Sequence, residues 1–272
     1  MHRTVLVALA LPLCVTALWA SDDKDKTKPK KEPSAAAKQF ADLQKEYKTA
    51  ESALLKEFKA AKSEDEPAKI IARYKETLAT FSNRFVKIAE EHPTDPVAFD
   101  ALVWAVTHQA DGLNTAGEKA ARLLAHYHAR DPRIRRVCDS FARVQAPAAE
   151  ELLKAVLADN PKEETRASAC LALAQVLQNR SDSEAMKGHK EEAARASKES
   201  EGYFNQVVRD FGDVKINARN AQDEVKGDLF ELHSLAVGKT APDIEGKDSS
   251  GKSFRLSDYR GKVVILDFWA RW

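Results

Sequence analysis

Cysteine is scarce in this sequence. There are three in 272 residues, and one of them, Cys14, lies in the apolar N-terminal stretch. The other two, Cys138 and Cys170, cannot build a disulfide-rich scaffold and form no Cys-x-x-Cys pair. Cys170 lies on the apolar face of a helical pattern and is expected to be an inert buried thiol. A disulfide between Cys138 and Cys170 stays open as an alternative in an oxidising compartment.

The chain also has almost no net charge and few helix breakers. Lys+Arg is 43 and Asp+Glu is 42, which gives a formal net charge of +1. This balance gives no support to nucleic-acid or membrane-surface binding through a global field. Glycine and proline occur ten times each, which favours helix. The length suits two domains better than one small domain.

Motifs for cofactors, metals and hydrolysis are absent from the sequence. There is no phosphate-binding loop and no Ser/His/Asp arrangement. His126 and His128 are two residues apart, so a helix points them to different faces and they form no zinc pair. We therefore expect no cofactor and no metal.

The N-terminus predicts an export signal. Arg3 gives a positive start, residues 4–20 form an apolar run, and charge begins at Asp22. A run of about 17 residues is short for a membrane span and typical of a signal peptide. Small residues predict cleavage after Ala17 or Ala20, so residues 1–20 are read as a signal peptide. The mature chain would then reach the periplasm or cell envelope without stable membrane insertion, whereas an uncleaved signal would anchor it.

A charged linker and a long helical region follow. Residues 21–34 contain hardly any apolar side chain and predict a solvated tether. From residue 35 to about 235 the apolar residues recur at helical spacing. Pro67 is placed to begin a helix, and Asp95 is a candidate N-cap for the next one. The apolar stripes of the first two helices are Phe40, Leu43, Tyr47, Leu54 and Phe58, then Ile70, Ile71, Tyr74, Leu78, Phe81, Phe85 and Ile88.

Weak internal repeats predict stacked helical hairpins. A bulky pair such as Leu152-Leu153 is followed by a helix stop such as Asn160-Pro161, and the pattern occurs three times. In texture this region resembles tetratricopeptide repeats, although their full consensus is absent. We expect an α-helical, TPR-like domain over residues 35–235 that offers a surface for a protein partner. The polar stretch 179–200 is expected to extend one helix into solvent.

The composition changes between residues 230 and 237. Four of the ten glycines lie in the last 36 residues, with turn residues between short apolar segments. The run 263–266 is continuously apolar and rich in β-branched residues, which predicts a buried central strand. We expect a domain boundary here, with a β-rich unit over residues 237–272.

The motifs of this last segment resemble the thioredoxin-like redoxins of the TlpA-like and AhpC/TSA group. The resemblance covers about 36 residues and is specific because several motifs occur in the family's order. They are Val237-Gly238, Ala241-Pro242-Asp243, Gly251-Lys252, the connector 256–262, the strand 263–267 and Phe268-Trp269-Ala270-Arg271-Trp272. The fold class is therefore mainly α, followed by the N-terminal β part of an α/β thioredoxin-like fold.

The resemblance implies thiol–disulfide exchange with protein thiols or disulfides as substrates. In the family a Cys-x-x-Cys stands directly after the FWAxW motif, at a helix N-terminus that stabilises the thiolate. Asp267 matches the buried acid that accepts the proton of the resolving thiol, and Trp272 would flank the active site. The sequence ends at Trp272, so we expect this chain to be a fragment without the family's dithiol chemistry.

Two alternatives remain. A peroxiredoxin would carry Pro and Thr before a single cysteine, which Ala270-Arg271-Trp272 fits poorly. A non-catalytic helical interaction scaffold is the other alternative. The sequence fixes neither the direction of the redox reaction nor the client protein.

Overall fold

The computed structural model of the chain describes residues 32–63, 65–110, 112–216, 218–235 and 239–267. The expected signal peptide (1–20), most of the charged linker (21–34) and Trp272 lie outside these residues. Within the described part, no helix has the length and apolar character needed to cross a membrane.

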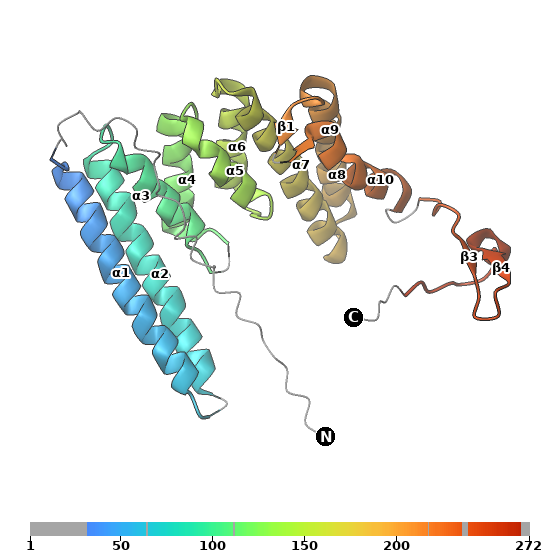
Figure 1. Ribbon diagram of the computed structural model, residues 1–272, viewed down its shortest axis with the longest axis horizontal. Coiled ribbons are helices and arrows are strands. Elements are labelled where there is room, and N and C mark those ends of the chain that lie inside the picture. Colours follow the sequence, from blue (N-terminus) through green and yellow to red (C-terminus); the bar gives the residue numbers. More distant parts are fainter. Residues whose placement is uncertain (1–31, 64, 111, 217, 236–238, 268–272) are drawn as a thin grey trace.

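Eight helices of seven residues or more fill most of the chain from Ala35 to Phe211 (Figure 1). They are α1 (Ala35–Ala60), α2 (Glu66–Glu91), α3 (Val97–Thr107), α4 (Thr115–His128), α5 (Arg135–Phe141), α6 (Pro147–Asp159), α7 (Glu163–Met186) and α8 (Lys190–Phe211). A 3₁₀ turn, Pro132–Ile134, leads into α5.

Shorter elements follow α8. They are the paired strands β1 (Lys215–Ile216) and β2 (Arg219–Asn220), the helices α9 (Ala221–Glu224) and α10 (Lys226–Phe230), a π-helical turn (Glu231–Leu235), the strands β3 (Glu245–Lys247) and β4 (Ser253–Arg255), and a 3₁₀ turn (Leu256–Tyr259). The expected order, helices first and β structure last, is confirmed.

The first helices begin and end where the sequence signals them. Ser34 caps α1 by accepting a hydrogen bond from the Ala37 N–H at 3.0 Å. A proline lies in the first turn of α2, and α2 ends at Glu91, with His92 as the C-cap just before Pro93. Asp95 Oδ1 accepts from the Val97 N–H at 2.9 Å, but Pro96 rather than the predicted Asp95 is the N-cap residue of α3.

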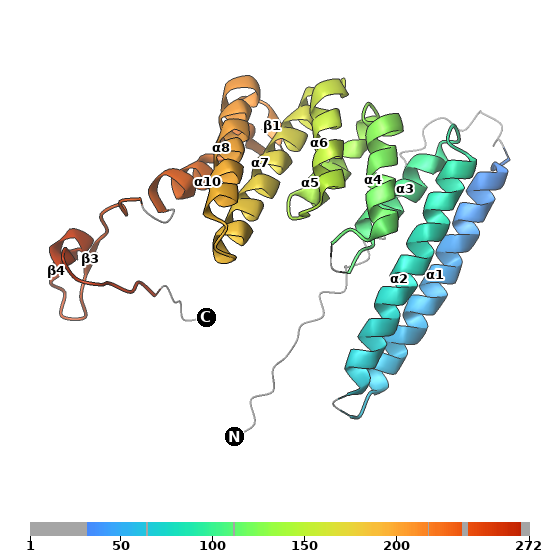
Figure 2. The same cartoon turned by 180° about the vertical axis from the view of Figure 1, so that it is seen from behind.

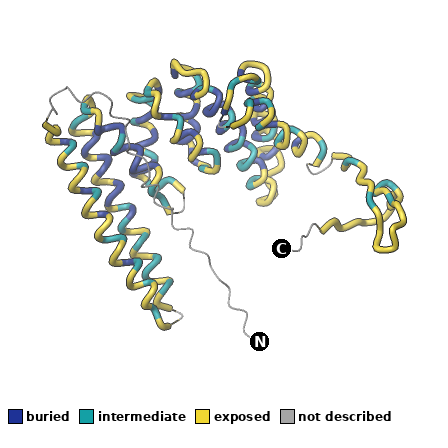
Figure 3. The backbone as a smooth tube through the Cα atoms, in the orientation of Figure 1, coloured by how far each residue is buried: buried dark blue, intermediate teal, exposed yellow. Residues whose placement is uncertain are grey.

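The helical hairpins stack side by side from α1 and α2 at one end to α7 and α8 at the other (Figures 1 and 2). Neighbours in the stack pack as α1 on α2, α2 on α3, α3 on α4, α4 on α6, α6 on α7 and α7 on α8. A second set of contacts joins α3 to α5 and α5 to α7. Buried residues follow the inner sides of the stacked helices (Figure 3). One hydrophobic cluster therefore extends from α1 to α7, and a second lies where α8 packs on α7. The resemblance to tetratricopeptide repeats stays a prediction.

An aromatic cluster closes the α1 end of this core. The Trp104 ring lies 4.1 Å from that of Phe85, centroid to centroid, and 4.8 Å from that of Tyr47. His108 stacks on Trp104 with centroids 4.2 Å apart and ring planes only 7° from parallel. These contacts join α1, α2 and the end of α3, and they explain why the aromatic stripes of the sequence pack together.

The polar stretch 179–200 differs from its prediction. It does not extend one helix. α7 ends at Met186 and α8 begins at Lys190, so the stretch contains a helical hairpin. Gly188, with φ of +83°, makes the turn. Two buried serines hold the hairpin: Ser181 Oγ donates to the Ala193 carbonyl at 2.9 Å, and Ser200 Oγ donates to the Ala174 carbonyl at 2.8 Å.

Candidate functional site

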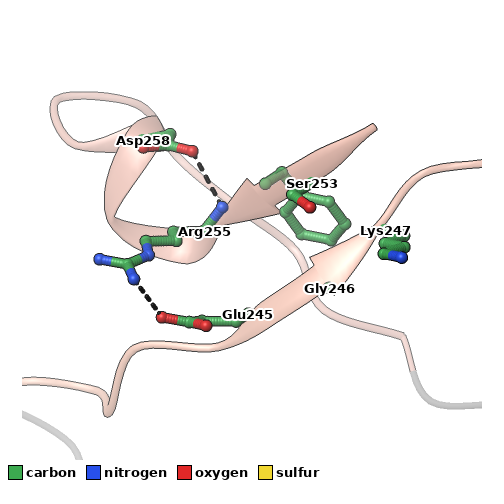
Figure 4. Close-up of a pocket in the computed structure, with 7 residues that line it drawn as sticks. Glu245, Gly246, Lys247, Ser253, Arg255 and Asp258 are labelled. Carbon is green, nitrogen blue, oxygen red and sulfur yellow. Dashed lines mark hydrogen bonds and ion pairs between the residues drawn. The ribbon is translucent and has the colours of Figure 1, made fainter. Parts of the chain in front are cut away.

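The motif-bearing residues near the C-terminus form a small antiparallel hairpin, with β3 paired to β4 (Figure 4). Gly246 lies directly opposite Phe254 in the register. A Cβ atom added to Gly246 would lie 3.0 Å from the Phe254 ring, so the ring covers the glycine backbone. This cross-strand pair explains why glycine occupies a strand position here.

Asp248 organises the hairpin turn. Its Oδ1 accepts hydrogen bonds from the Ser250 N–H at 2.8 Å and from the Lys252 N–H at 3.0 Å. Gly251 completes the turn with φ of +86°. Hydrogen bonds from Ser250 hold the pKa of Asp248 below its ordinary value. The Gly251-Lys252 motif is therefore the end of a tight loop.

Asp243 of the Ala-Pro-Asp motif connects the entry of the hairpin to its exit. Its two carboxylate oxygens accept from the N–H and the Oγ of Ser257, both at 2.8 Å. The hydroxyl and N–H of Ser257 hold the pKa of Asp243 below its ordinary value. The backbone adds a bond from the Leu256 N–H to the Ile244 carbonyl at 2.9 Å. Residues 243 and 257, far apart in sequence, are thus held together.

Asp258 fixes the turn that follows β4. Its Oδ2 accepts from the Arg255 N–H at 2.9 Å, as a capping residue does at the start of a helix (Figure 4). Arg255 also pairs with Glu245 across the hairpin at 2.5 Å. These groups border an open hollow of about 510 Å³ that contains no cysteine or histidine. The hairpin is therefore a scaffold rather than a reactive centre.

The predicted central strand is wrong for this structure. Residues 263–267 form no regular element, and Val263 and Ile265 are 96% and 90% exposed. A strand needs hydrogen-bonded neighbours, and in the described part of the chain β3 and β4 pair only with each other. Asp267 is consequently exposed where burial was expected. Its catalytic role stays a prediction, and Trp272 lies outside the described residues.

The two helical cysteines are free and buried. Burial raises the pKa of each thiol to about 12, which removes the reactive thiolate at neutral pH. Cys170 Sγ lies 3.6 Å from the Tyr203 carbonyl. The interpretation of Cys170 as an inert buried thiol is confirmed, and the alternative disulfide to Cys138 is not formed. Across the described ranges, no group of three His, Cys, Asp or Glu residues could hold a metal ion.

Comparison with known proteins finds one family and several curated relatives. The model of the AhpC/TSA family matches residues 237–272. The thiol-disulfide oxidoreductase ResA of Geobacillus thermodenitrificans is 52% identical over 42 residues, which are 15% of this chain and 24% of that protein. ResA of Geobacillus kaustophilus is 55% identical over the same length, with the same coverage. ResA of Bacillus subtilis is 44% identical over 39 residues, 14% of this chain and 22% of its own.

Residues 237–272 match the AhpC/TSA family model, and we refer to them below as the redoxin segment. The chain spans about a quarter of the length of the curated relatives it matches. No solved structure matches the chain. The likeness of this chain to the AhpC/TSA family therefore rests on residues 237–272.

Sequence reasoning found the redoxin motifs but missed what their acidic residues do. The motifs gave no structural role to Asp243 and Asp258. In the structure each accepts a hydrogen bond that fixes a backbone turn. The signal was present in the sequence. An Asp next to Pro, and an Asp three residues after the end of a short strand, are both common side-chain caps.

Proposed function

We propose that this chain is part of an exported thiol–disulfide oxidoreductase that acts on protein thiols or disulfides. The observation that carries the proposal is the match of residues 237–272 to the AhpC/TSA family, with 52–55% identity to two ResA proteins over 42 residues. The order of the motifs adds support, because Asp243, Asp248 and Asp258 each stabilise the hairpin that precedes the family's central strand.

The proposed chemistry needs a Cys-x-x-Cys beyond Trp272. The first thiolate would attack a substrate disulfide to give a mixed disulfide, and the second thiol would displace the reduced substrate. Asp267 would accept the proton of the second thiol once the surrounding fold buries it, because burial raises the pKa of a carboxylate toward that of a general base. Trp272 would border the cysteine pair.

The organisation we propose places this chemistry after a helical domain. Residues 1–20 direct export, 21–34 form a tether, 35–235 form the helical domain and 237–272 begin the redoxin domain. The helical domain would present its stacked hairpins to a protein partner. Export can be tested by intact-mass analysis of the protein from the host's exported fraction, where a mass that retains residues 1–20 would argue against cleavage.

Insulin reduction coupled to dithiothreitol tests the activity. The 272-residue chain should not exceed a Cys138→Ser/Cys170→Ser control, because both thiols are buried and protonated at neutral pH. A protein that continues through the downstream coding sequence should reduce insulin, and should lose this activity when the first cysteine after Trp272 is replaced by serine. Reduction by the 272-residue chain above the double-serine control, or the lack of a Cys-x-x-Cys downstream, would overturn the proposal.

A further inference from the structure

The helical part ends in an element with an exposed apolar side. No residue of α10 is buried, and Phe230 at its end is 52% exposed. In the π-helical turn that follows, Leu232 is buried and anchors the turn, whereas Leu235 is 55% exposed. His233 Nε2 adds a contact to Glu201 Oε1 of α8 at 2.9 Å. This terminal element is held in place, yet it leaves two large apolar side chains in solvent.

Acidic groups surround this element. An open hollow of about 610 Å³ lies where α5, α7 and α10 meet, and Arg143 is the one basic residue among those that line it. The carboxylates at the hollow are Asp139, Asp182, Asp228 and Glu231. Burial, with added repulsion from Glu231 and Glu224, raises the pKa of Asp228. The residues that line the hollow therefore carry four carboxylates against one basic side chain.

The redoxin segment carries the opposite balance. Residues 239–262 contain six basic residues and four acidic ones. Three of the acids, Asp243, Asp248 and Asp258, already accept hydrogen bonds within the hairpin, and Glu245 pairs with Arg255. Lys247, Lys252 and Arg260 are exposed. The hairpin therefore presents unneutralised positive charge, with the half-exposed Ile244 and Tyr259 beside it.

The connection between the two parts is short. Nine residues, 236–244, separate Leu235 from the start of β3, and nine residues span at most about 30 Å. The hairpin lies beyond the α10 end of the helical stack, away from α1 (Figure 1). A tether of this length keeps the hairpin near α10 at an effective concentration in the millimolar range.

We propose that the terminal element, with its exposed Phe230 and Leu235, and the acidic hollow that Asp228 and Glu231 of the same element line form a docking surface for the redoxin segment of the same chain. Three features favour this occupant over a separate protein. The two surfaces carry opposite charge, each exposes apolar side chains, and the connection between them is short. Docking would fix the orientation of the redoxin unit relative to the stacked hairpins. This inference goes beyond the proposed function and does not depend on thiol chemistry.

Paramagnetic relaxation enhancement in the full chain tests the docking. A spin label at Ser249→Cys, with Cys14→Ser to remove the leader thiol, would report on the hairpin, because Cys138 and Cys170 are buried and resist labelling. At about 20 mM salt the amide signals of residues 228–235 should broaden. At about 500 mM salt they should recover, because the Debye length then falls below the spacing of the charges.

Reversing charges on either side tests whether the acidic hollow causes the broadening. Asp228→Lys/Glu231→Lys should abolish the broadening, and so should Lys252→Glu/Arg260→Glu, which leaves the helical part untouched. Combining the four changes should restore it. Asp42→Lys/Glu76→Lys, two exposed sites on α1 and α2, is the matched control and should leave it unchanged. Absence of broadening at low salt, or broadening that survives either charge reversal in a chain with native circular dichroism, would overturn the proposal.

Discussion

At the scale of single residues, a few polar side chains decide where the helical repeats join. Asn160 is buried after α6, and its Nδ2 donates to the carbonyls of Ala129 at 2.7 Å and Asp131 at 3.2 Å, both after α4. Its Oδ1 accepts from the Lys162 N–H at 3.0 Å. One side chain thus connects the ends of two successive hairpins.

Replacing Asn160 by alanine should lower the free energy of unfolding by about 2 kcal/mol, because the carbonyl of the buried Ala129 loses its donor and the Asp131 carbonyl keeps only the Ile134 N–H. Asn83→Ala is the control. Asn83 is exposed and donates only to the Ala79 carbonyl of its own helix, so its loss should change stability by less than about 0.5 kcal/mol. Urea unfolding followed by circular dichroism measures both. Equal losses of unfolding free energy in the two variants would show that the hydrogen bonds of Asn160 between α4 and α6 do not stabilise the fold.

His108 should make stability depend on pH. Burial lowers its pKa, opposed by its hydrogen bond to the Trp104 carbonyl and by the nearby Glu51. Tyr47 of α1 faces the ring, and the Tyr47 hydroxyl contacts Tyr74 of α2. Because the unfolded chain binds the proton more readily, this contribution is complete above about pH 6.5 and is lost as the pH falls below it.

The pH dependence can be isolated by substitution. The loss of unfolding free energy between pH 7.5 and 5 should be smaller in His108→Gln than in the wild-type chain. His126→Gln, at an exposed position on α4, should leave the loss unchanged. If the unfolding free energy of His108→Gln fell with pH as steeply as that of the wild-type chain, the His108 imidazole would be as easily protonated in the folded chain as in the unfolded one.

At the scale of elements, sequence pattern predicted the helices with a strong apolar stripe and failed where tertiary context decides. The α1 and α2 stripes were correct because three- and four-residue spacing places Leu43 and Tyr47 on the buried face of α1, and likewise Phe85 on the buried face of α2. The stretch 179–200 was misread because its alanine and glutamate content suits any helix, and only the positive φ of Gly188 reveals the turn. The strand at 263–266 failed because its apolar content gives no information about a pairing neighbour.

Two glycines in this region should respond to alanine with opposite signs. Gly188→Ala should destabilise by about 1–2 kcal/mol, since an L side chain is strained at φ of +83°. Gly202→Ala should stabilise by about 0.5–1 kcal/mol, because Gly202 lies inside α8 with open space around the added methyl group. Thermal unfolding of the two variants checks the pair. Stabilisation by Gly188→Ala would mean that α7 and α8 are one continuous helix in solution.

At the scale of the whole molecule, the helical part has its own hydrophobic core, whereas the redoxin segment does not. Buried residues extend through the helices, and a second cluster around Phe204, Val207 and Ile216 closes the α8 end. The redoxin segment has no fully buried residue among those described. The sequence predicted the order of helices first and β structure last, and it predicted the candidate site only as motifs. The domain boundaries stay a prediction.

A fragment of residues 35–235 should fold independently. Its core does not need the redoxin segment, so circular dichroism should show strong helix and a cooperative thermal transition. The control is the fragment 237–272, which should lack a cooperative transition because two short strands without a covered face are marginal in water. A non-cooperative melt of 35–235 would show that the helical part requires residues outside this range.

A chimera tests the central claim, that residues 237–272 are a working redoxin segment, most directly. In ResA of Geobacillus kaustophilus, the stretch aligned with 237–272 would be replaced by this chain's residues, and insulin reduction would be measured. The account predicts that the chimera folds and reduces insulin at a rate comparable to the parent, and that Asp267→Asn in the chimera slows the reaction while Asp248→Asn, at the hairpin turn, affects it less. A folded chimera without reductase activity would contradict the account.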